Sequence, residues 1–387
     1  MWALAMISKI RMENFKCLQE VEVDLGPFNI LIGPNDSGKT SFLEAISWLN
    51  KTTRNDLTLG PAEYDRFQHL VWRKQADMGI VWNIVGDANG RFEYFLEISP
   101  YVHKKREKLR VGEKVIFDAA DGAQVIYGGL STQAQQHQTL LSLFSAHERH
   151  RAPIGPLVAV ADSLMSTEEY HFNPRAMRQP SAVQKTPRLS SSGENLAGVL
   201  HGMLIGPDRQ AVVEMEKKLG EAIPTLRGFS TPPAADQSGH YVIDYTLSGP
   251  KKPPATIPAT QVSDGAILLT AFLALAYGDT PQIVLLEEPE NGLHPSMLKR
   301  VIELLRKMST GEVGNQARQI ILTTHSPLLL NFVEPEEVRI FRRTPQGGTQ
   351  VTPMSAVPNI DNLQREFAPG ELWYLFGEEK LVEGQPA

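Results

Sequence analysis

The sequence predicts an α/β fold built on a parallel sheet, and three observations carry this prediction. A short apolar strand, a glycine-rich loop and a helix follow one another over residues 28–50. Two further apolar strands, at 282–286 and 319–323, lie on either side of an amphipathic helix at 295–308. Polar residues directly follow the end of each of these strands. Strands that alternate with helices, with functional residues after their carboxyl ends, are typical of parallel α/β sheets.

The glycine-rich loop has the pattern of a phosphate-binding loop, G-x-x-x-x-G-K-[ST]. Its glycines let the backbone approach phosphate oxygens, and the amides at the helix start supply partial positive charge. Lys39 can reach the β- and γ-phosphates of a nucleotide, and the Thr40 hydroxyl can bind Mg²⁺. We therefore expect nucleotide binding by Gly33, Pro34, Asn35, Asp36, Ser37, Gly38, Lys39, Thr40 and Ser41.

Two acids follow the strand at 282–286. The run of apolar residues ending in Glu287 has the Walker B form, with Glu where Asp is usual. A carboxylate at this place holds Mg²⁺, and Glu288 is then placed to orient and deprotonate the attacking water. His325 ends the next strand, where its imidazole can hydrogen-bond the γ-phosphate or the water. We expect Glu288 and His325 to be catalytic and Glu287, with Thr40, to hold the metal.

Ser263, Asp264 and Gly265 open an apolar helix that runs from residue 266 to 277. The amides and the hydroxyl at such a helix start can bind an anion. His294 precedes the helix at 295–308, and two interpretations stay open for it: a subunit contact, or a cap of that helix.

The composition narrows the class of protein. A chain of 387 residues with 42% hydrophobic residues can form two to three domains or one large one. Its net charge of −6 argues against a basic surface that covers the protein, although a local basic groove is compatible with it. Cys17 is the only cysteine, so an internal disulfide and a thiolate metal cluster are excluded. Because we find neither an apolar run that could cross a bilayer nor a signal peptide, we expect a cytoplasmic protein without a membrane partner.

Other stretches predict an antiparallel β lobe and several helices. We expect an N-terminal β-meander over 7–32 with a turn at 14–16, a hairpin over 78–98, strands within 109–127, helices at 140–148, 194–204 and 208–223, a strand at 241–245, and irregular connections at 54–65, 133–137 and 170–192. Basic residues gather in His103–Arg106 and at Lys108. They form either a solvated loop or a contact for nucleic acid or a partner.

Taken in order, the phosphate loop, the Ser-x-Gly helix start, the acidic pair and the terminal His resemble an ABC-type ATPase head. More narrowly, residues 14–16, 287–295 and 324–327 resemble the SMC/RecF/OLD group of AAA-type ATPases, and 192–196 is similar to a stretch common among its stand-alone members. The resemblance implies a P-loop NTPase with an inserted, mainly helical subdomain. We accordingly expect four segments: 1–130 and 258–345 as the two parts of the head, 131–257 as the insert, and 346–387 as an extension that is a possible partner contact.

The resemblance also implies a mechanism. Two heads would face each other with two ATP molecules between them, so that Ser263, Asp264 and Gly265 of one copy touch the γ-phosphate held by Lys39 of the other. Hydrolysis would then open a homodimer or higher homo-oligomer. Gly265-Ala266 departs from the usual Gly-Gln of the signature. Gln179 and Gln184 are candidates for the glutamine of the family's Q-loop.

Within this group, the chain lacks the heptads of an SMC protein, and its insert is longer than that of a transporter ATPase. An OLD-type nuclease continues into a toprim domain; residues 382–384 resemble the start of one, but we expect no nuclease domain here. Our hypothesis is a sensor or regulatory subunit for a separate effector, a nuclease or toxin, in bacterial defence against phage. The alternatives are a RecF-like DNA-binding repair ATPase and a scaffold that ATP locks without hydrolysis. Residues 371–375 form either a partner surface or a last helix packed on the core.

Overall fold

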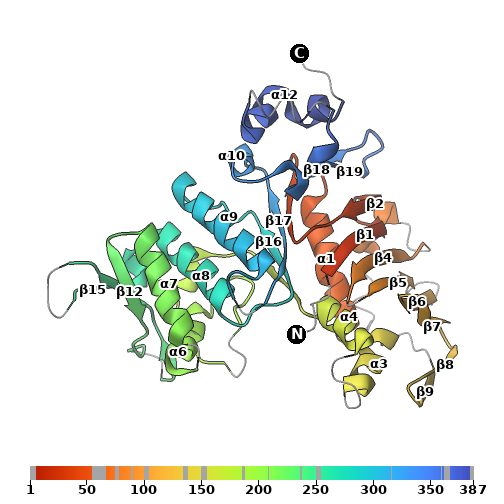
Figure 1. Cartoon of the computed structure of the whole chain (residues 1–387), viewed down its shortest axis with the longest axis horizontal. Coiled ribbons are helices and arrows are strands. Elements are labelled where there is room, and N and C mark those ends of the chain that lie inside the picture. Colours follow the sequence, from red (N-terminus) through yellow and green to blue (C-terminus); the bar gives the residue numbers. More distant parts are fainter. Residues whose placement is uncertain are drawn as a thin grey trace. The chain divides into compact units, whose positions relative to one another are not determined.

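A computed structural model describes the protein at residues 6–54, 67–74, 78–88, 90–99, 104–133, 138–149, 155–184, 188–207, 209–235, 238–249, 254–314, 316–358, 360 and 367–383. The chain divides into two compact units (Figure 1). Unit 1 comprises Met1–Thr167 and Val333–Ala387, and unit 2 comprises Glu168–Phe332. This division falls at other positions than the four expected segments, which remain a prediction.

Unit 1 contains a six-stranded antiparallel sheet. Its order is β2-β1-β4-β5-β6-β7, with β1 at Met6–Phe15, β2 at Leu18–Asp24, β4 at Ile80–Asp87, β5 at Arg91–Ser99, β6 at Lys104–Val111 and β7 at Lys114–Ala120. The predicted hairpin over 78–98 is confirmed as β4 and β5, in which Trp82 lies opposite Leu96 and Ile84 opposite Tyr94.

The strand that precedes the phosphate loop belongs elsewhere, so the predicted N-terminal meander over 7–32 is wrong at its third strand. β3, Phe28–Ile32, pairs in parallel with β18, Val338–Arg343, which pairs with β19, Thr349–Pro353. The burial patterns explain the difference. All five β3 residues are buried, whereas β2 alternates between buried and exposed positions. A strand buried on both faces fits inside a covered sheet, and an alternating one fits a sheet with a solvated face.

Helix α1, Lys39–Arg54, follows the phosphate loop and packs on the antiparallel sheet. The indole of Trp82 stacks on that of Trp48 with ring centroids 5.4 Å apart, and Trp82 Nε1 donates to Ala45 O at 3.1 Å. The sheet thereby fixes the helix whose first turn carries Lys39. The other elements of unit 1 are β8 at Gln124–Tyr127, β9 at Leu130–Gln133, α3 at Leu140–Arg149, α4 at Pro156–Met165 and α12 at Pro369–Glu383.

The basic stretch is not a loop. Lys104–Arg106 and Lys108 lie in strand β6, while His103 falls outside the described residues. Lys105 is buried, and its Nζ lies 3.5 Å from a buried carboxylate oxygen of Glu107. The alternation of β6 sends Lys105, Glu107 and Leu109 to the core, so a charged sequence conceals a strand.

Unit 2 is organised around a parallel strand pair and one buried helix. β16, Ile283–Glu287, pairs in parallel with β17, Gln319–Thr324, and β10, Thr167–Tyr170, lies on the other side of β16. α8, Asp264–Tyr277, is buried at every position from Ala266 to Ala276. A helix that is apolar all round belongs in the core, which agrees with its sequence.

The remaining elements of unit 2 surround this core. They are α5 at Pro174–Met177, β11 at Ser181–Ala182, α6 at Leu196–Ile205, α7 at Arg209–Ala222, β12 at Leu226–Ser230, β13 at His240–Tyr241, β14 at Asp244–Leu247, β15 at Thr256–Pro258, α9 at Pro295–Thr310 and α10 at Pro327–Leu330. The strand predicted at 241–245 is two strands: β13 pairs with β11, and β14 with β12. Among the described residues, we find no helix long and apolar enough to span a membrane.

Candidate functional site

The phosphate loop of unit 1 is a closed turn around its own lysine. Lys39 Nζ donates to the backbone oxygens of Gly33 at 2.7 Å and Pro34 at 2.8 Å, and the side chain is only 6% exposed. Pro34, Asn35, Asp36 and Thr40 are exposed around it. The ammonium group is therefore held at the loop, where a phosphate would meet it.

Close backbone contacts explain the two glycines of the loop. A Cβ on Gly33 would lie 2.1 Å from Phe341 O, and Gly38 has a φ of +103° with Thr349 Oγ1 2.3 Å from the place of a Cβ. No L side chain fits at either position. Thr349 Oγ1 also donates to Ser37 O at 2.9 Å, and the Cys17 thiol donates to Ser41 Oγ at 3.4 Å. Residues from β19 and from the β1–β2 turn thus support the loop.

In unit 2, the carboxyl ends of β16 and β17 bring Glu288 and His325 together. His325 Nδ1 lies 2.9 Å from Glu288 Oε1, and Asn291 Nδ2 donates to Glu288 Oε2 at 2.9 Å. The Glu288 backbone has a φ of +46°, and its N–H donates to Thr323 O at 3.1 Å. A left-handed conformation at a non-glycine residue costs energy and is concentrated at functional sites. The backbone therefore holds the Glu288 side chain at this strand end.

Glu290 is a buried acid beside this pair. Thr324 Oγ1 donates to Glu290 Oε1 at 2.5 Å, whereas Glu290 Oε2 is buried with no hydrogen-bond partner. Burial raises the pKa of Glu290, because a charged carboxylate is poorly solvated there. The Glu290–Thr324 bond ties the turn after β16 to the end of β17, and so fixes the backbone on either side of Glu288 and His325.

Glu287 ends β16 and meets a residue that the sequence analysis did not select. His171 Nδ1 lies 3.3 Å from Glu287 Oε2, because His171 directly follows β10, the neighbour of β16. Gln179 and Gln184, the candidate Q-loop residues, are exposed, and Gln179 Nε2 donates to Arg175 O in its own turn. In the sequence, the only indication for His171 was its place directly after the four-residue strand β10. The irregular connection expected over 170–192 did not include this strand, so His171 was not selected.

Ser263, Asp264 and Gly265 form the start of α8. Ser263 is the N-cap, and its Oγ accepts from Ala266 N at 3.3 Å. The Arg178 guanidinium contacts Asp264 Oδ1 at 2.7 Å and donates to the backbone oxygens of Ala259 and Val262. Arg178 thereby fixes the helix start.

His294 is the N-cap of α9 and accepts from Ser296 N, which accounts for it as a helix cap.

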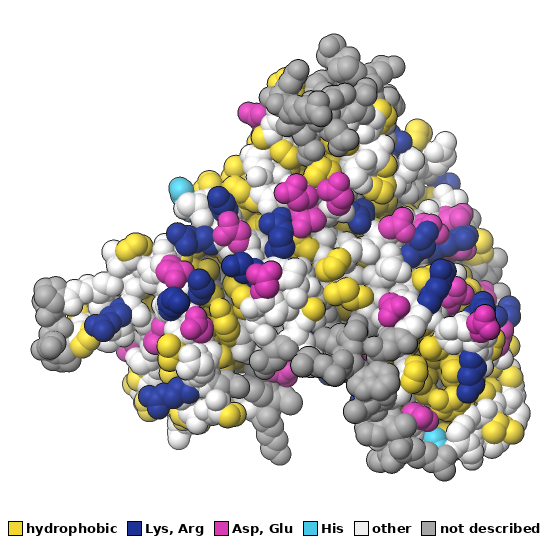
Figure 2. All heavy atoms as spheres, viewed as in Figure 1, with side chains coloured by type: hydrophobic (Ala, Val, Ile, Leu, Met, Phe, Trp, Pro, Cys, Tyr) yellow, Lys and Arg dark blue, Asp and Glu magenta, His cyan; other side chains and the backbone are white. Residues whose placement is uncertain are grey.

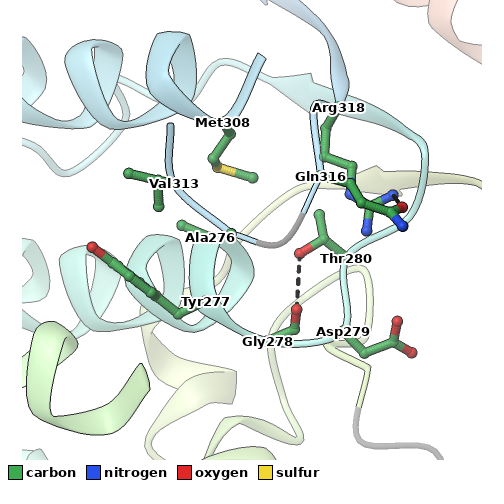
Figure 3. Close-up of a pocket in the computed structure, with 10 residues that line it drawn as sticks. Ala276, Tyr277, Gly278, Asp279, Thr280, Met308, Val313, Gln316 and Arg318 are labelled. Carbon is green, nitrogen blue, oxygen red and sulfur yellow. Dashed lines mark hydrogen bonds between the residues drawn. The ribbon is translucent and has the colours of Figure 1, made fainter. Parts of the chain in front are cut away.

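Unit 2 also contains a pocket of about 260 Å³ (Figure 3). It borders the end of α8 at Tyr277 and Gly278, the turn at Asp279 and Thr280, and Arg318 just before β17. These positions are at the amino ends of β16 and β17, while Glu287 is the last residue of β16 and His325 directly follows β17. The pocket contains none of the predicted site residues.

The charges do not form a basic stripe on the face that Figure 2 shows, where Lys and Arg are intermingled with Asp and Glu. On β6 and β7, Asp118 contacts both Arg106 at 3.3 Å and Lys108 at 3.0 Å. Lys105 is buried and faces Glu107, so Lys105, Arg106 and Lys108 of this cluster each have an acidic neighbour within the sheet.

The residues present fit a nucleotide with a divalent cation. The Thr40 hydroxyl at the first turn of α1 in unit 1 and the Glu287 carboxylate at the end of β16 in unit 2 are each hard oxygen donors, the type that Mg²⁺ prefers. In the described part of the chain, no group of three or more His, Cys, Asp or Glu side chains could hold a metal without other ligands. A cation at either residue would therefore depend on phosphate oxygens and water as well.

Comparison with known proteins agrees with this geometry. Residues 6–113 match the family described as "AAA ATPase domain", and residues 254–331 match the family described as "AAA domain, putative AbiEii toxin, Type IV TA system". The chain is 23% identical to the OLD nuclease of Thermus scotoductus over 368 residues, which are 87% of this chain and 62% of that protein. It is 54% identical over 81 residues to the DNA replication and repair protein RecF of Haemophilus influenzae, which are 20% of this chain and 23% of RecF.

The chain thus spans less than two thirds of the length of the curated relatives it matches. Among solved structures, it is similar to an SMC head bound to the C-winged helix domain of ScpA, with a TM-score of 0.55 and 13% identity over 89% of this chain and 97% of that one. The structural likeness shows the fold of an ABC-type ATPase head. The sequence matches are to ATPase domains, an OLD nuclease and RecF, so the chain is similar to ATPases of the SMC/RecF/OLD type.

Proposed function

We propose that the chain binds ATP with Mg²⁺ and hydrolyses it to ADP and phosphate. The strongest support is the contact between Glu288 and His325, which directly follow the strands β16 and β17. Glu288 is also the residue next to Glu287, the proposed metal ligand. A carboxylate held by an imidazole and by Asn291 has the orientation needed to take a proton from water. Glu288 is the general base in this proposal, and His325 positions it and contacts the γ-phosphate.

The phosphate loop supplies the binding part of the mechanism. Lys39 would exchange its contacts with Gly33 O and Pro34 O for the β- and γ-phosphate oxygens. Thr40 and Glu287 would hold the cation, which neutralises charge on the phosphates when it is bound. Because the loop is already folded around its lysine, little backbone ordering is required on binding.

ATP turnover by matched variants tests this proposal. Glu288→Gln keeps the shape of the side chain but removes the base, so we expect kcat to fall at least about 100-fold. Glu303→Gln, on the exposed side of α9, is the control and should hydrolyse ATP at the wild-type rate. If Glu288→Gln turns over ATP as fast as the wild type, the hydrolase proposal is wrong. ATP binding without turnover in either protein would favour the scaffold that ATP locks.

We further propose that two copies complete the site. Ser263, Asp264 and Gly265 form a helix start that Arg178 fixes, and such a start can receive phosphate oxygens. In this proposal they meet the γ-phosphate bound by Lys39 of the other copy. Hydrolysis then separates the two copies, so that ATP controls assembly.

The biological role we propose is a sensor or regulatory subunit for a nuclease or toxin in defence against phage. The support is the likeness to an OLD nuclease over 87% of the chain, and the family description that names a toxin of a type IV TA system. A plaque assay compares cells that express the chain with its effector against cells in which Lys39→Ala replaces the wild type. Equal phage titres on both would count against the role.

A RecF-like repair function is the second candidate, because the RecF match reaches 54% identity over its 81 residues. This alternative requires ATP-dependent binding to duplex DNA. Fluorescence anisotropy of a labelled duplex, measured with and without ATP over a range of salt concentrations, separates the two roles.

A further inference from the structure

We propose that the imidazole of His171 is a ligand of the divalent cation at the predicted nucleotide site, together with Glu287, and that this site favours Mn²⁺ over Mg²⁺ more than an all-oxygen site does. This inference rests on the proposed binding of ATP with a cation. It concerns a residue that neither the motif analysis nor the family resemblance selected.

The distance between the two side chains suits a shared ion. His171 Nδ1 and Glu287 Oε2 are 3.3 Å apart. Two ligands at adjacent corners of an octahedron with bonds of about 2.1 Å lie about 3 Å apart, so both atoms can face one cation after a small adjustment. The His171 side chain is 62% exposed and that of Glu287 25% exposed, which leaves room for phosphate oxygens and water as the other ligands.

The backbone of His171 is fixed from several sides. Its N–H donates to Ser191 O at 2.9 Å, and Asn173 N donates to Ser192 O at 3.0 Å. The Phe172 ring packs edge-on against Phe272 of the buried helix α8, with centroids 5.1 Å apart. His171 is therefore placed beside Glu287 by the fold, which is the rigidity that a metal ligand needs.

The turn that receives these bonds is itself tightly held. Asn195 accepts from Ser190 N at 2.8 Å and donates to Arg188 O at 2.9 Å, and Gly193 has a φ of +75° with the Met177 side chain where a Cβ would be. This is the stretch at 192–196 that resembles stand-alone ATPases of the group. Its function here is to hold the backbone that carries His171.

The chemistry of the ligands predicts the choice of ion. Carboxylate and hydroxyl oxygens suit Mg²⁺, whereas an imidazole nitrogen raises affinity for first-row transition ions relative to Mg²⁺. Since Glu287 and His171 are only two ligands, the ion needs the phosphates of the nucleotide to complete its coordination. We therefore expect Mn²⁺ to bind tightly only when a nucleotide is present.

Pulsed electron paramagnetic resonance of the full chain with Mn²⁺ and AMP-PNP tests this directly. Coupling of Mn²⁺ to phosphorus reports that the ion sits on the bound nucleotide, and coupling to nitrogen reports an imidazole ligand. Protein labelled with ¹⁵N-histidine should change the nitrogen modulation, which assigns it to a histidine. We expect both couplings in the wild type, and the loss of the nitrogen coupling alone in His171→Gln.

His294→Gln is the matched control, because His294 caps α9 and contacts Ser296. It should keep both couplings. In a competition of Mg²⁺ against Mn²⁺, His171→Gln should lower the preference for Mn²⁺ by about tenfold, while His294→Gln leaves it unchanged.

Three outcomes contradict the inference, and they can be told apart. Phosphorus coupling without histidine nitrogen coupling, or nitrogen coupling that survives His171→Gln, would overturn the role of His171 and leave the proposed ATP binding intact. If no Mn²⁺–nucleotide complex forms, with both couplings absent at saturating nucleotide, the proposed function fails together with the inference.

Discussion

Thr349 shows that a single hydroxyl far along the chain can shape the phosphate loop. It lies in β19 and is buried, and its Oγ1 donates to Ser37 O at 2.9 Å, across 312 positions of sequence. It also fills the space beside Gly38 where a Cβ would be. The loop pattern is visible in the sequence, but the residue that supports it is not, because only the pairing of β19 with β18 brings Thr349 there.

We predict that Thr349→Val weakens ATP binding about fivefold. Valine keeps the shape of the side chain but removes one hydrogen bond, which is worth about 1 kcal/mol, and leaves Ser37 O without this donor. Isothermal titration with AMP-PNP and Mg²⁺ measures the change. Thr352→Val, on the same strand, is the control and should bind as the wild type does. Equal affinities for the two variants would show that Thr349 does not hold the loop.

The acidic pair and His171 mark the limit of prediction from residue patterns. Glu288 and His325 could be selected because each directly follows an apolar strand that is recognisable without a structure, and the structure brings these two side chains within 2.9 Å. His171 follows β10, which has only four residues and the sequence TEEY. Such a strand has no hydrophobic period, so its place beside β16, and with it the contact to Glu287, comes from the tertiary fold alone.

At the scale of secondary structure, β6 shows how a charged sequence can form a core strand. Glu107 is buried and accepts from the backbone N–H groups of Leu140 at 2.7 Å and Leu141 at 2.9 Å, at the start of α3. It also accepts from Tyr94 Oη at 3.0 Å and faces Lys105. Burial, and then the charge of Glu107, raise the pKa of Tyr94 far above its usual range, so the phenol stays a hydrogen-bond donor.

We predict that Glu107→Ala lowers the free energy of unfolding by about 3–5 kcal/mol. The substitution removes the carboxylate that faces the buried Lys105 ammonium, and the first amides of α3 lose their acceptor. Arg106→Ala is the matched control on the same strand, because the Arg106 side chain is 54% exposed, and it should change stability by less than about 1 kcal/mol. Urea denaturation followed by circular dichroism measures both. Similar midpoints for the two variants would contradict the structural role of Glu107.

The same elements show which parts of the fold a sequence can supply. The hairpin of β4 and β5 was predicted, because alternating apolar residues flank a turn sequence. The place of β3 in the parallel sheet was not predicted, because its pairing with β18 joins residues about 300 positions apart, which no local pattern encodes. Residues 371–375 lie on α12 with Leu372 buried and Tyr374 77% exposed, so the helix has both a packed and a solvated side, and its role as a partner surface stays a prediction.

At the scale of the whole molecule, the components of the predicted site are distributed over the chain. The phosphate loop belongs to unit 1, and the acidic pair, His325 and the helix start at Ser263 belong to unit 2. Hydrolysis in the proposed mechanism needs all of them at one nucleotide. ATP is then the element that couples the parts, and its removal should weaken both the site and any assembly that depends on it.

We predict that Glu288→Gln with ATP and Mg²⁺ forms a dimer or a higher oligomer. The variant should bind ATP but not consume it, so the state in which Ser263 of one copy meets the γ-phosphate of the other persists. Light scattering after size exclusion should then give a mass of at least twice 42.9 kDa with ATP. With ADP, the same variant should have the mass of one chain. The double variant Lys39→Ala/Glu288→Gln is the control, because it lacks the lysine that holds the phosphates, and it should stay at the single mass with ATP. A Glu288→Gln protein that remains at 42.9 kDa with saturating ATP would exclude the head-to-head arrangement, whereas the same oligomer in the double variant would show that assembly does not depend on ATP.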